Sequence, residues 1–263
     1  MFTYDPGYTS TASCESKITF IDGENSELRY RGYDIADLAG KHSFLDVSHL
    51  LMMGKLPTPE VSKSFDLEIR HRSFLNEGII RLFDALPDGA HPMATMGAAT
   101  MALSAFYKDH LHLEDEEQFK MMRRRILAKM PVIAAMAYRN SIGTPLIYPD
   151  VNRYFTENFL YMLRAYPGGR MKYLGDGRND EIKQVEIDAL DAILTLHADH
   201  EQNASTTTVR NVGSTEAHPY VAIASGISAL WGSAHGGANE KVMDQLRMIG
   251  DVKNVASFIA KAK

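Results

Sequence analysis

Two histidine motifs contain the residue types best suited to chemistry in this sequence. The first, at residues 196–205, reads L-H-A-D-H-E-Q-N-A-S, and the second, at residues 233–239, reads S-A-H-G-G-A-N. His197 and His200 are three residues apart, so on a helix their rings would rise from one face. His235 precedes two glycines and a predicted helix. A histidine at the positive end of a helix tends to stay neutral and can donate a hydrogen bond to a polarised carbonyl. The pattern predicts chemistry on an enol or enolate.

Both motifs have other interpretations. An H-x-x-H pair on an amphipathic helix is more often a satisfied polar pair, and Gly-Gly after a histidine is by itself usually a turn. A metal site is a further alternative, since Asp199 and Glu201 join His197 and His200 as plausible ligands. The chain has neither H-E-x-x-H nor a cysteine pair, so no recognised zinc spacing is complete and we expect no metal.

The two motifs together resemble the citrate synthase family, and within it the bacterial Gram-negative-type branch. The second motif is part of a longer similar stretch, G-I-S-A-L-W-G-S-A-H-G-G-A-N-E. Residues 2–23 and the region around residues 129–145 are similar to the same branch. The matches are nearly colinear over most of residues 2–263, except at residues 167–180, whose four glycines and several charges are typical of an inserted loop.

The resemblance implies a role for each motif residue. Citrate synthases condense acetyl-CoA with oxaloacetate: a carboxylate removes a methyl proton beside the thioester, a histidine stabilises the enol, and the enol attacks the ketone. By this resemblance, His235 is the catalytic donor to the thioester oxygen. His200 is catalytic and binds oxaloacetate, while His197 and Asn203 support the substrate pocket. No resident cofactor is expected, because acetyl-CoA is a substrate.

Several parts of the family pattern have no counterpart in the 263 residues. They are the N-terminal β extension, the carboxylate base, a third active-site histidine and the arginines that grip oxaloacetate. We therefore expect a partial large domain without the catalytic small domain, inactive or nearly so alone. It would be a trimmed chain, or one subunit of a split enzyme completed by a C-terminal partner polypeptide. The alternatives are a 2-methylcitrate synthase chain that uses propionyl-CoA, a non-catalytic dimerising scaffold or regulatory paralogue, and a metal-dependent hydrolase.

The elements that must position these motifs are nearly all helices. We predict an all-α fold: an extended arm and one short β-hairpin in residues 1–32, with strands at 18–22 and 27–30, and helices through residues 33–263. Helices are expected at 33–38, 44–53, 59–72, 75–85, 91–106, 114–129, 131–138, 151–166, 182–200, 203–212, 222–230, 239–248 and 252–262. The helix at 182–200 would deliver the first motif.

Three of the predicted helices are nearly all apolar. Residues 92–106, 131–138 and 222–230 are rich in Ala, Met and Gly, and such helices are buried on every side or lie against a second copy of themselves. An ordinary helical core is one interpretation. The other, which the resemblance favours, is a helical sandwich between two subunits, because three such helices are hard to cover in one short chain. We expect a homodimer or a higher oligomer.

A basic cluster marks the helix predicted at residues 114–129. Its ordinary interpretation is a solvated face. In the Gram-negative-type branch, however, a basic cluster in this region is associated with an inhibitory NADH site, and the resemblance places Arg70, His71, Arg125 and Lys129 where its contacts would lie. Arg72 and Ser73 depart from the pattern of that branch. No G-x-G-x-x-G loop follows a strand, which excludes a Rossmann-type nucleotide site.

Composition limits the partners and the compartment. The net charge of −5 and a pI near 6.1 predict no general attraction for nucleic acid or an anionic membrane. A single cysteine, Cys14, excludes an internal disulfide framework and suits a reducing cytosol. We find neither a window of about 18 apolar residues nor a secretory leader, so we expect a cytoplasmic protein.

Overall fold

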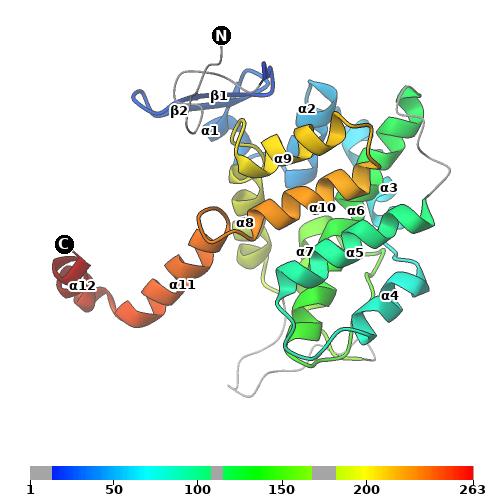
Figure 1. The fold of residues 1–263 in the computed structure, drawn as a ribbon. Helices are drawn as coiled ribbons and strands as arrows, with labels where there is room; N and C mark the ends of the chain where they lie inside the picture. The colour runs from blue at the N-terminus through cyan, green and yellow to red at the C-terminus, as the bar shows by residue number, and fades with distance from the viewer. Residues whose placement is uncertain (1–13, 108–114, 168–181, 263) are drawn as a thin grey trace, which may run out of the picture.

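The computed structural model describes residues 14–107, 115–167 and 182–262, and it shows a helical body with a small sheet at one edge (Figure 1). The all-α prediction with a short N-terminal sheet is confirmed. The elements are β1 (Thr19–Asp22), β2 (Glu27–Tyr30), β3 (Tyr33–Asp34), α1 (Ile35–Leu38), α2 (Phe44–Met53), α3 (Pro59–Arg72), α4 (Glu77–Asp84), α5 (Pro92–Phe106), α6 (Glu116–Ser141), α7 (Phe155–Arg164), α8 (Gln184–Leu196), α9 (Ala204–Gly213), α10 (Pro219–Leu230), α11 (Gly237–Ile249), η1 (Val252–Asn254) and α12 (Val255–Ala262). Nearly all of the predicted arm and the predicted loop at 167–180 lie outside the described residues.

The sheet contains one strand more than the sequence predicted. Its antiparallel order is β1-β2-β3, and in the second pairing Tyr33 lies opposite Tyr30. The prediction of a single hairpin was therefore wrong, and so was the predicted helix start at residue 33, because residues 33 and 34 form β3. Arg31 and Gly32 both take positive φ, 51° and 89°, which reverses the chain directly after β2. The helix begins only after Asp34, whose side chain accepts a hydrogen bond from the backbone N–H of Ala36.

The predicted break at Pro131 was also wrong. Helix α6 runs without interruption from Glu116 to Ser141 and contains Pro131, where two helices were expected. A proline inside a helix removes one backbone hydrogen bond and crowds the preceding turn. Here the next turns are fully buried in the main core through Val132, Ile133 and Met136. Their burial offsets the cost of the proline, so the helix continues.

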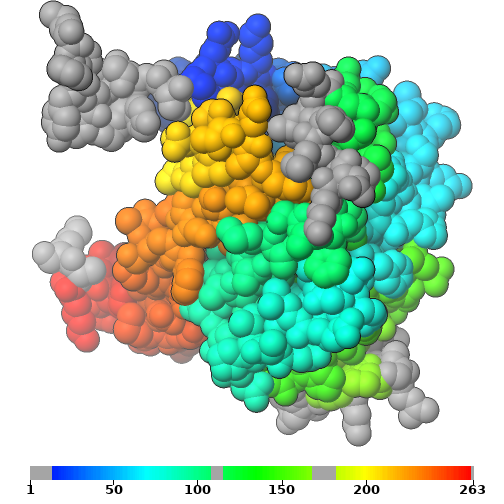
Figure 2. Space-filling view, turned by 45° about the vertical axis from the view of Figure 1, so that its right-hand side comes forward, coloured from blue at the N-terminus to red at the C-terminus, as the bar shows by residue number. Residues whose placement is uncertain are grey.

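The main core lies where α4, α5, α6, α7 and α10 meet, and α10 packs against both α5 and α9. Figure 2 shows α9 and α10, in yellow and orange, beside α5, in teal, on one face of the molecule. A second, smaller cluster joins the sheet to α1 and α2 through Tyr30, Leu38, Val47 and Leu50, and Ala198 of the first histidine motif packs against it. This cluster therefore places the hairpin beside that motif.

The C-terminal helices extend away from the body. In Figure 1, α11 and α12 continue from the end of α10 to one side of the helical body. All residues of α11 are described, and none of them is buried. This exposure contrasts with α10, where Tyr220, Ala224 and Ile227 are buried. The second histidine motif thus lies at the junction between a packed helix and an exposed one.

Candidate active site

The first histidine motif lies in a connection and not on a helix face. Helix α8 ends at Leu196, His197 is its C-cap, and His200 belongs to the turn before α9. The prediction of a helix to residue 200 was therefore wrong. Glu201 takes a positive φ of 59°, which helical geometry does not allow. The two rings are nevertheless neighbours, because their centroids are 6.4 Å apart.

His197 has one ring nitrogen engaged in the structure. Its Nδ1 lies 2.8 Å from the backbone carbonyl oxygen of Ile193. A carbonyl can only accept, so Nδ1 carries the hydrogen and Nε2 is the nitrogen left for a ligand. Both His197 and His200 are exposed, and their rings are accessible from solvent. When its imidazole is protonated, His197 can donate through Nε2 to a carboxylate.

Asn203 closes the connection by capping α9. Its side-chain oxygen accepts a hydrogen bond of 2.9 Å from the backbone N–H of Thr206, and α9 begins at the next residue. The helix that the sequence predicted to restart here is confirmed, with Asn203 as its N-cap and Ala204 as its first residue. Because the oxygen is used by the cap, the side-chain NH₂ group is the part of Asn203 that can donate to a substrate.

The second motif forms a tight turn between α10 and α11. The backbone N–H of His235 donates to the carbonyl of Gly232, and α11 begins at Gly237. A Cβ on Gly236 would lie 2.4 Å from the carbonyl oxygen of Leu230, so any larger residue would force this turn open. His235 is partly buried immediately before the start of α11. The predicted position of His235 at a helix start is thus confirmed.

Ser205 joins the two motifs, and the sequence reasoning missed it. The Nε2 atom of His235 lies 2.9 Å from the Ser205 hydroxyl oxygen, in the first turn of α9 and two residues after Asn203. When Ser205 donates to Nε2, the imidazole hydrogen lies on Nδ1, which can then donate to a ligand oxygen. Ser205 ends the first motif, but no spacing rule distinguishes it from the neighbouring threonines.

The predicted regulatory residues divide into two groups. Arg125 and Lys129 lie together over the ring of Tyr107, with the Arg125 guanidinium carbon 4.7 Å from the ring centroid and the Lys129 nitrogen 5.9 Å from it.

Arg70 is engaged elsewhere: it forms an ion pair of 2.7 Å with Asp66 and donates to the carbonyl of Val151. His71 is exposed.

Lys129 is buried and holds the end of α3. Its Nζ donates to the carbonyl of Arg72 at 2.9 Å and also to the carbonyl of Phe74. Burial is the main reason that the pKa of Lys129 falls from 10.5 to about 8, and the charges of Arg125 and Arg72 lower it further. Lys129 therefore has a structural role that its sequence position did not reveal.

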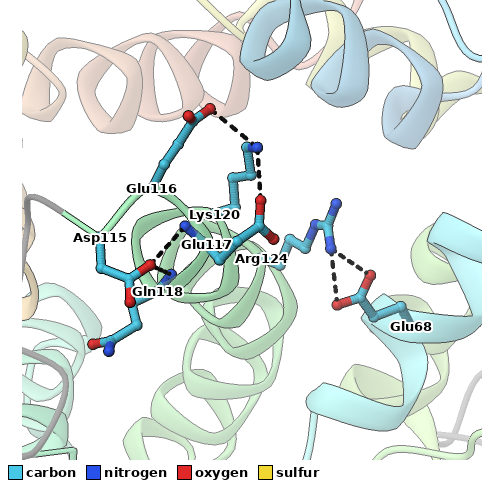
Figure 3. A network of polar contacts seen from close by, with 7 residues as sticks. All are labelled: Glu68, Asp115, Glu116, Glu117, Gln118, Lys120 and Arg124. Carbon is cyan, nitrogen blue, oxygen red and sulfur yellow. Dashed lines mark hydrogen bonds and ion pairs between the residues drawn. The ribbon is translucent and has the colours of Figure 1, made fainter.

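The rest of the basic cluster on α6 is largely ion-paired. Lys120 contacts Glu116 at 3.0 Å and Glu117 at 2.9 Å, while Arg124 reaches across to Glu68 on α3 at 3.0 Å (Figure 3). Asp115 caps the helix through the backbone N–H groups of residues 117 and 118. These pairs support the interpretation of this face as a solvated, charge-balanced surface.

A cavity of about 940 Å³ lies away from both motifs. It opens between α2, α3, α7 and α8, and none of the three motif histidines lines it. Asp191 lies in its wall, where the carboxylate accepts hydrogen bonds from the Thr156 hydroxyl and the Phe44 backbone N–H. Burial raises the pKa of Asp191, and these two hydrogen bonds oppose the effect. The convergence of His197, His200 and His235 on one cavity stays a prediction.

The part of the chain that the structure describes contains neither a metal-binding cluster nor a membrane-spanning helix. Within residues 14–107, 115–167 and 182–262, no group of three or more His, Cys, Asp or Glu side chains could hold a metal ion. Asp199, one of the four candidate ligands, has its carboxylate engaged by the Thr19 hydroxyl. None of the described helices is long and apolar enough to cross a membrane.

The chain is a mainly helical protein whose candidate active-site histidines lie in the connections α8–α9 and α10–α11. The sequence model described as "Citrate synthase, C-terminal domain" matches residues 7–263. The chain belongs to the citrate synthase family.

Similar proteins include a curated sequence and solved structures. The citrate synthase of Helicobacter pylori (strain J99) is 54% identical over 263 residues, which are 100% of this chain and 62% of that protein. The structure of citrate synthase from Thermotoga maritima MSB8 has a TM-score of 0.77 at 29% identity, covering 98% of this chain and 64% of that one. Citrate synthase from Thermoplasma acidophilum, in a ternary complex with carboxymethyl coenzyme A and oxaloacetate, has a TM-score of 0.83 at 25% identity, covering 96% and 62%. The chain thus spans less than two thirds of each of these relatives.

Proposed function

We propose that the complete protein is a citrate synthase, which condenses acetyl-CoA with oxaloacetate to form citrate and coenzyme A. Family membership supports this reaction class. The observation that carries the proposal is the contact of 2.9 Å between His235 Nε2 and the Ser205 hydroxyl. It links the second motif to the start of α9, directly after the residues proposed to bind oxaloacetate.

In the proposed reaction, His235 stabilises the enol. The Nδ1–H of its imidazole donates to the thioester oxygen while a carboxylate base removes a proton from the acetyl methyl group. The enol carbon then bonds to the ketone carbon of oxaloacetate, whose oxygen takes a proton, and water cleaves the thioester to release citrate and coenzyme A. A donor fixed where negative charge develops and a base held nearby each lower part of the barrier, so both are needed.

Oxaloacetate is the proposed ligand of the first motif. His200 and the free Nε2 of His197 are accessible from solvent, and the side-chain NH₂ of Asn203 can donate. The NH₂ of Asn203 and a ring N–H of His200 are donors that suit the carboxylates and the ketone oxygen of a keto-diacid, and Nε2 of His197 joins them when that imidazole carries a second proton. No resident cofactor takes part in this proposal, because the acyl group arrives on coenzyme A.

We infer that activity requires a segment outside this chain. By the family resemblance, the carboxylate base and the arginines come from a small domain. It would be supplied to these residues, a partial large domain, by the rest of a longer chain or by a C-terminal partner polypeptide. Exposed apolar side chains support a docking role for α11 and α12: Val242, Met243, Leu246 and Ile259 are 48%, 51%, 55% and 50% exposed. We expect the isolated chain to be inactive or nearly so.

Self-association through α5 is also part of the proposal. Ala94, Ala98, Met101 and Ala105 recur at helical spacing on α5 and are all exposed. Together they form an exposed apolar stripe along α5. Small side chains allow a second α5 to approach closely, so we propose a homodimer as the smallest assembly.

Three finer assignments are proposals as well. The Gram-negative-type branch is supported by the resemblance of residues 2–23 and of the two motifs. Inhibition by NADH is supported only at Arg125, because Arg70 is engaged by Asp66 and Lys129 is buried with its Nζ bound to two backbone carbonyls. A cytosolic setting stays a prediction from the single cysteine.

The proposed function can be tested on this chain alone by measuring its thermal unfolding midpoint with and without oxaloacetate. We expect oxaloacetate to raise the unfolding midpoint of the chain, and His200→Gln to remove this shift. His42→Gln is the matched control, because His42 lines the separate cavity and should leave the shift unchanged. Equal protection of all three proteins, or of none, would contradict the assignment. A non-catalytic scaffold predicts no protection.

Turnover assays test the need for a second segment. The chain is assayed for coenzyme A release with and without a polypeptide corresponding to the remaining part of a full-length relative. Acetyl-CoA and propionyl-CoA compete in the same assay, which separates citrate from 2-methylcitrate synthesis. Substantial turnover by the isolated chain would refute the dependence on a partner.

A further inference from the structure

The hydroxyl of Tyr30 reaches the turn that carries the first histidine motif. Tyr30 is fully buried at the end of β2. Its hydroxyl donates to the carbonyl of Thr195 at 3.2 Å and accepts from the backbone N–H of Asp199 at 3.3 Å. Burial raises the pKa of Tyr30, so the hydroxyl keeps its hydrogen and stays a donor over the physiological range. One phenol thus joins both ends of the segment that contains His197.

Thr19 makes a second connection to the same turn. Its hydroxyl donates to the carboxylate of Asp199, which also accepts from the backbone N–H of Glu201 at 3.4 Å. Glu201 takes a left-handed φ of 59°, a conformation that is costly for a residue with a side chain. The carboxylate of Asp199 therefore links the hairpin to the strained residue directly after His200.

The two hydroxyls come from facing positions of one hairpin. Thr19 on β1 lies directly opposite Tyr30 on β2 in the antiparallel register. Side chains at opposite positions of an antiparallel pair project from the same face of the sheet. A single face of the hairpin thus presents two hydroxyl groups to residues 195–199, and Ala198 packs against the apolar cluster around Tyr30.

We propose that Tyr30 and Thr19 are positioning residues of the active site, which act through Asp199 to hold His197 and His200 in the geometry that binds oxaloacetate. This inference rests on the proposed function. Helix α8 ends at Leu196 and α9 begins at Ala204, so helical hydrogen bonding restrains His197 only as the C-cap, through Ile193, and does not extend to His200. The hairpin supplies the restraint that a helix would otherwise provide.

Variants that remove only the hydroxyl group of Tyr30 or Thr19 distinguish a positioning role of the hydrogen bonds from a packing role of the side chains. Tyr30→Phe and Thr19→Val each keep nearly the same volume and remove one hydrogen-bonding group. Tyr33→Phe is the matched control, because Tyr33 pairs with Tyr30 in the same sheet and is 40% exposed. Each variant of the full chain is examined for amide hydrogen exchange, residue by residue, and for the dissociation constant of oxaloacetate.

We expect both test variants to loosen the turn and leave the core intact. Amides of residues 198–201 should exchange about tenfold faster, and the oxaloacetate dissociation constant should rise about tenfold, as for the loss of one buried hydrogen bond. Amides in the buried part of α6, residues 132–137, should exchange as in the unchanged chain. Tyr33→Phe should change neither quantity.

The outcomes distinguish this inference from the proposed function. Unchanged exchange at residues 198–201 would overturn the positioning role. Faster exchange with unchanged oxaloacetate affinity would also overturn it, because a purely structural contact would behave in that way. If the unchanged chain binds no oxaloacetate at all, the proposed function fails for this chain, and the exchange data alone then decide whether the hairpin holds the turn.

Discussion

Lys129 offers a test of how the buried end of α3 is held. This lysine is 4% exposed, and its Nζ donates to the carbonyls of Arg72 and Phe74. Its pKa falls from 10.5 to about 8, chiefly through burial. The variant Lys129→Met keeps an unbranched side chain of similar length and removes the titrating group.

The sign of the pH effect follows from where the proton is held. Between pH 8 and pH 10.5 the folded chain has released the Lys129 proton, whereas the unfolded chain still binds it. Stability rises with pH wherever the unfolded state binds more protons. Below pH 8 both states are protonated, and the cost of the buried charge is present in full. The gain across the window amounts to about 3 kcal/mol of unfolding free energy.

Urea unfolding at pH 7.5, 8.5, 9.5 and 10.5 measures this gain. The unfolding free energy of the unchanged chain minus that of Lys129→Met should increase by about 3 kcal/mol over this range, because other titrating groups cancel in the difference. The variant also leaves the carbonyls of Arg72 and Phe74 without their donor. This loss shifts the difference in unfolding free energy by the same amount at every pH and so does not change its slope. Lys63→Met on the exposed part of α3 is the control and should give a flat difference. A flat difference for Lys129→Met as well would refute the reasoning.

Three further predictions concern catalysis, packing and assembly. Ser205→Ala should lower kcat of the completed enzyme about 10- to 100-fold with little change in the KM for oxaloacetate, because the His235 imidazole loses its orienting partner; steady-state kinetics measure both. Gly226→Ala should lower the unfolding free energy by about 1–3 kcal/mol in a urea titration, since its Cβ would lie 2.5 Å from a methyl group of Val209. Ala98→Glu should convert the proposed dimer to monomer in sedimentation velocity, because it places a charge within the exposed stripe of α5; an unchanged oligomer would contradict the assignment of that interface.

Local patterns in the sequence determined much of this protein. Asn203 precedes a helix because its side chain can cap one, and the glycines after His235 permit a turn too tight for other residues. The helical class, most helix positions and the family resemblance follow from signals of this kind. Helix caps and tight turns depend on residues only a few positions apart, so the spacing of residues in the sequence predicts them directly.

Only the tertiary structure decided how distant segments meet. Spacing predicted that His197 and His200 share a helix face, but contacts with Tyr30, more than 160 residues earlier, accompany the end of that helix at Leu196. Burial in the main core carries α6 through Pro131, although a local rule ends a helix there. The hydrogen bond between Ser205 and His235, which are 30 residues apart, likewise joins the two motifs. Such contacts depend on which surfaces pack together, and packing is set by the whole chain.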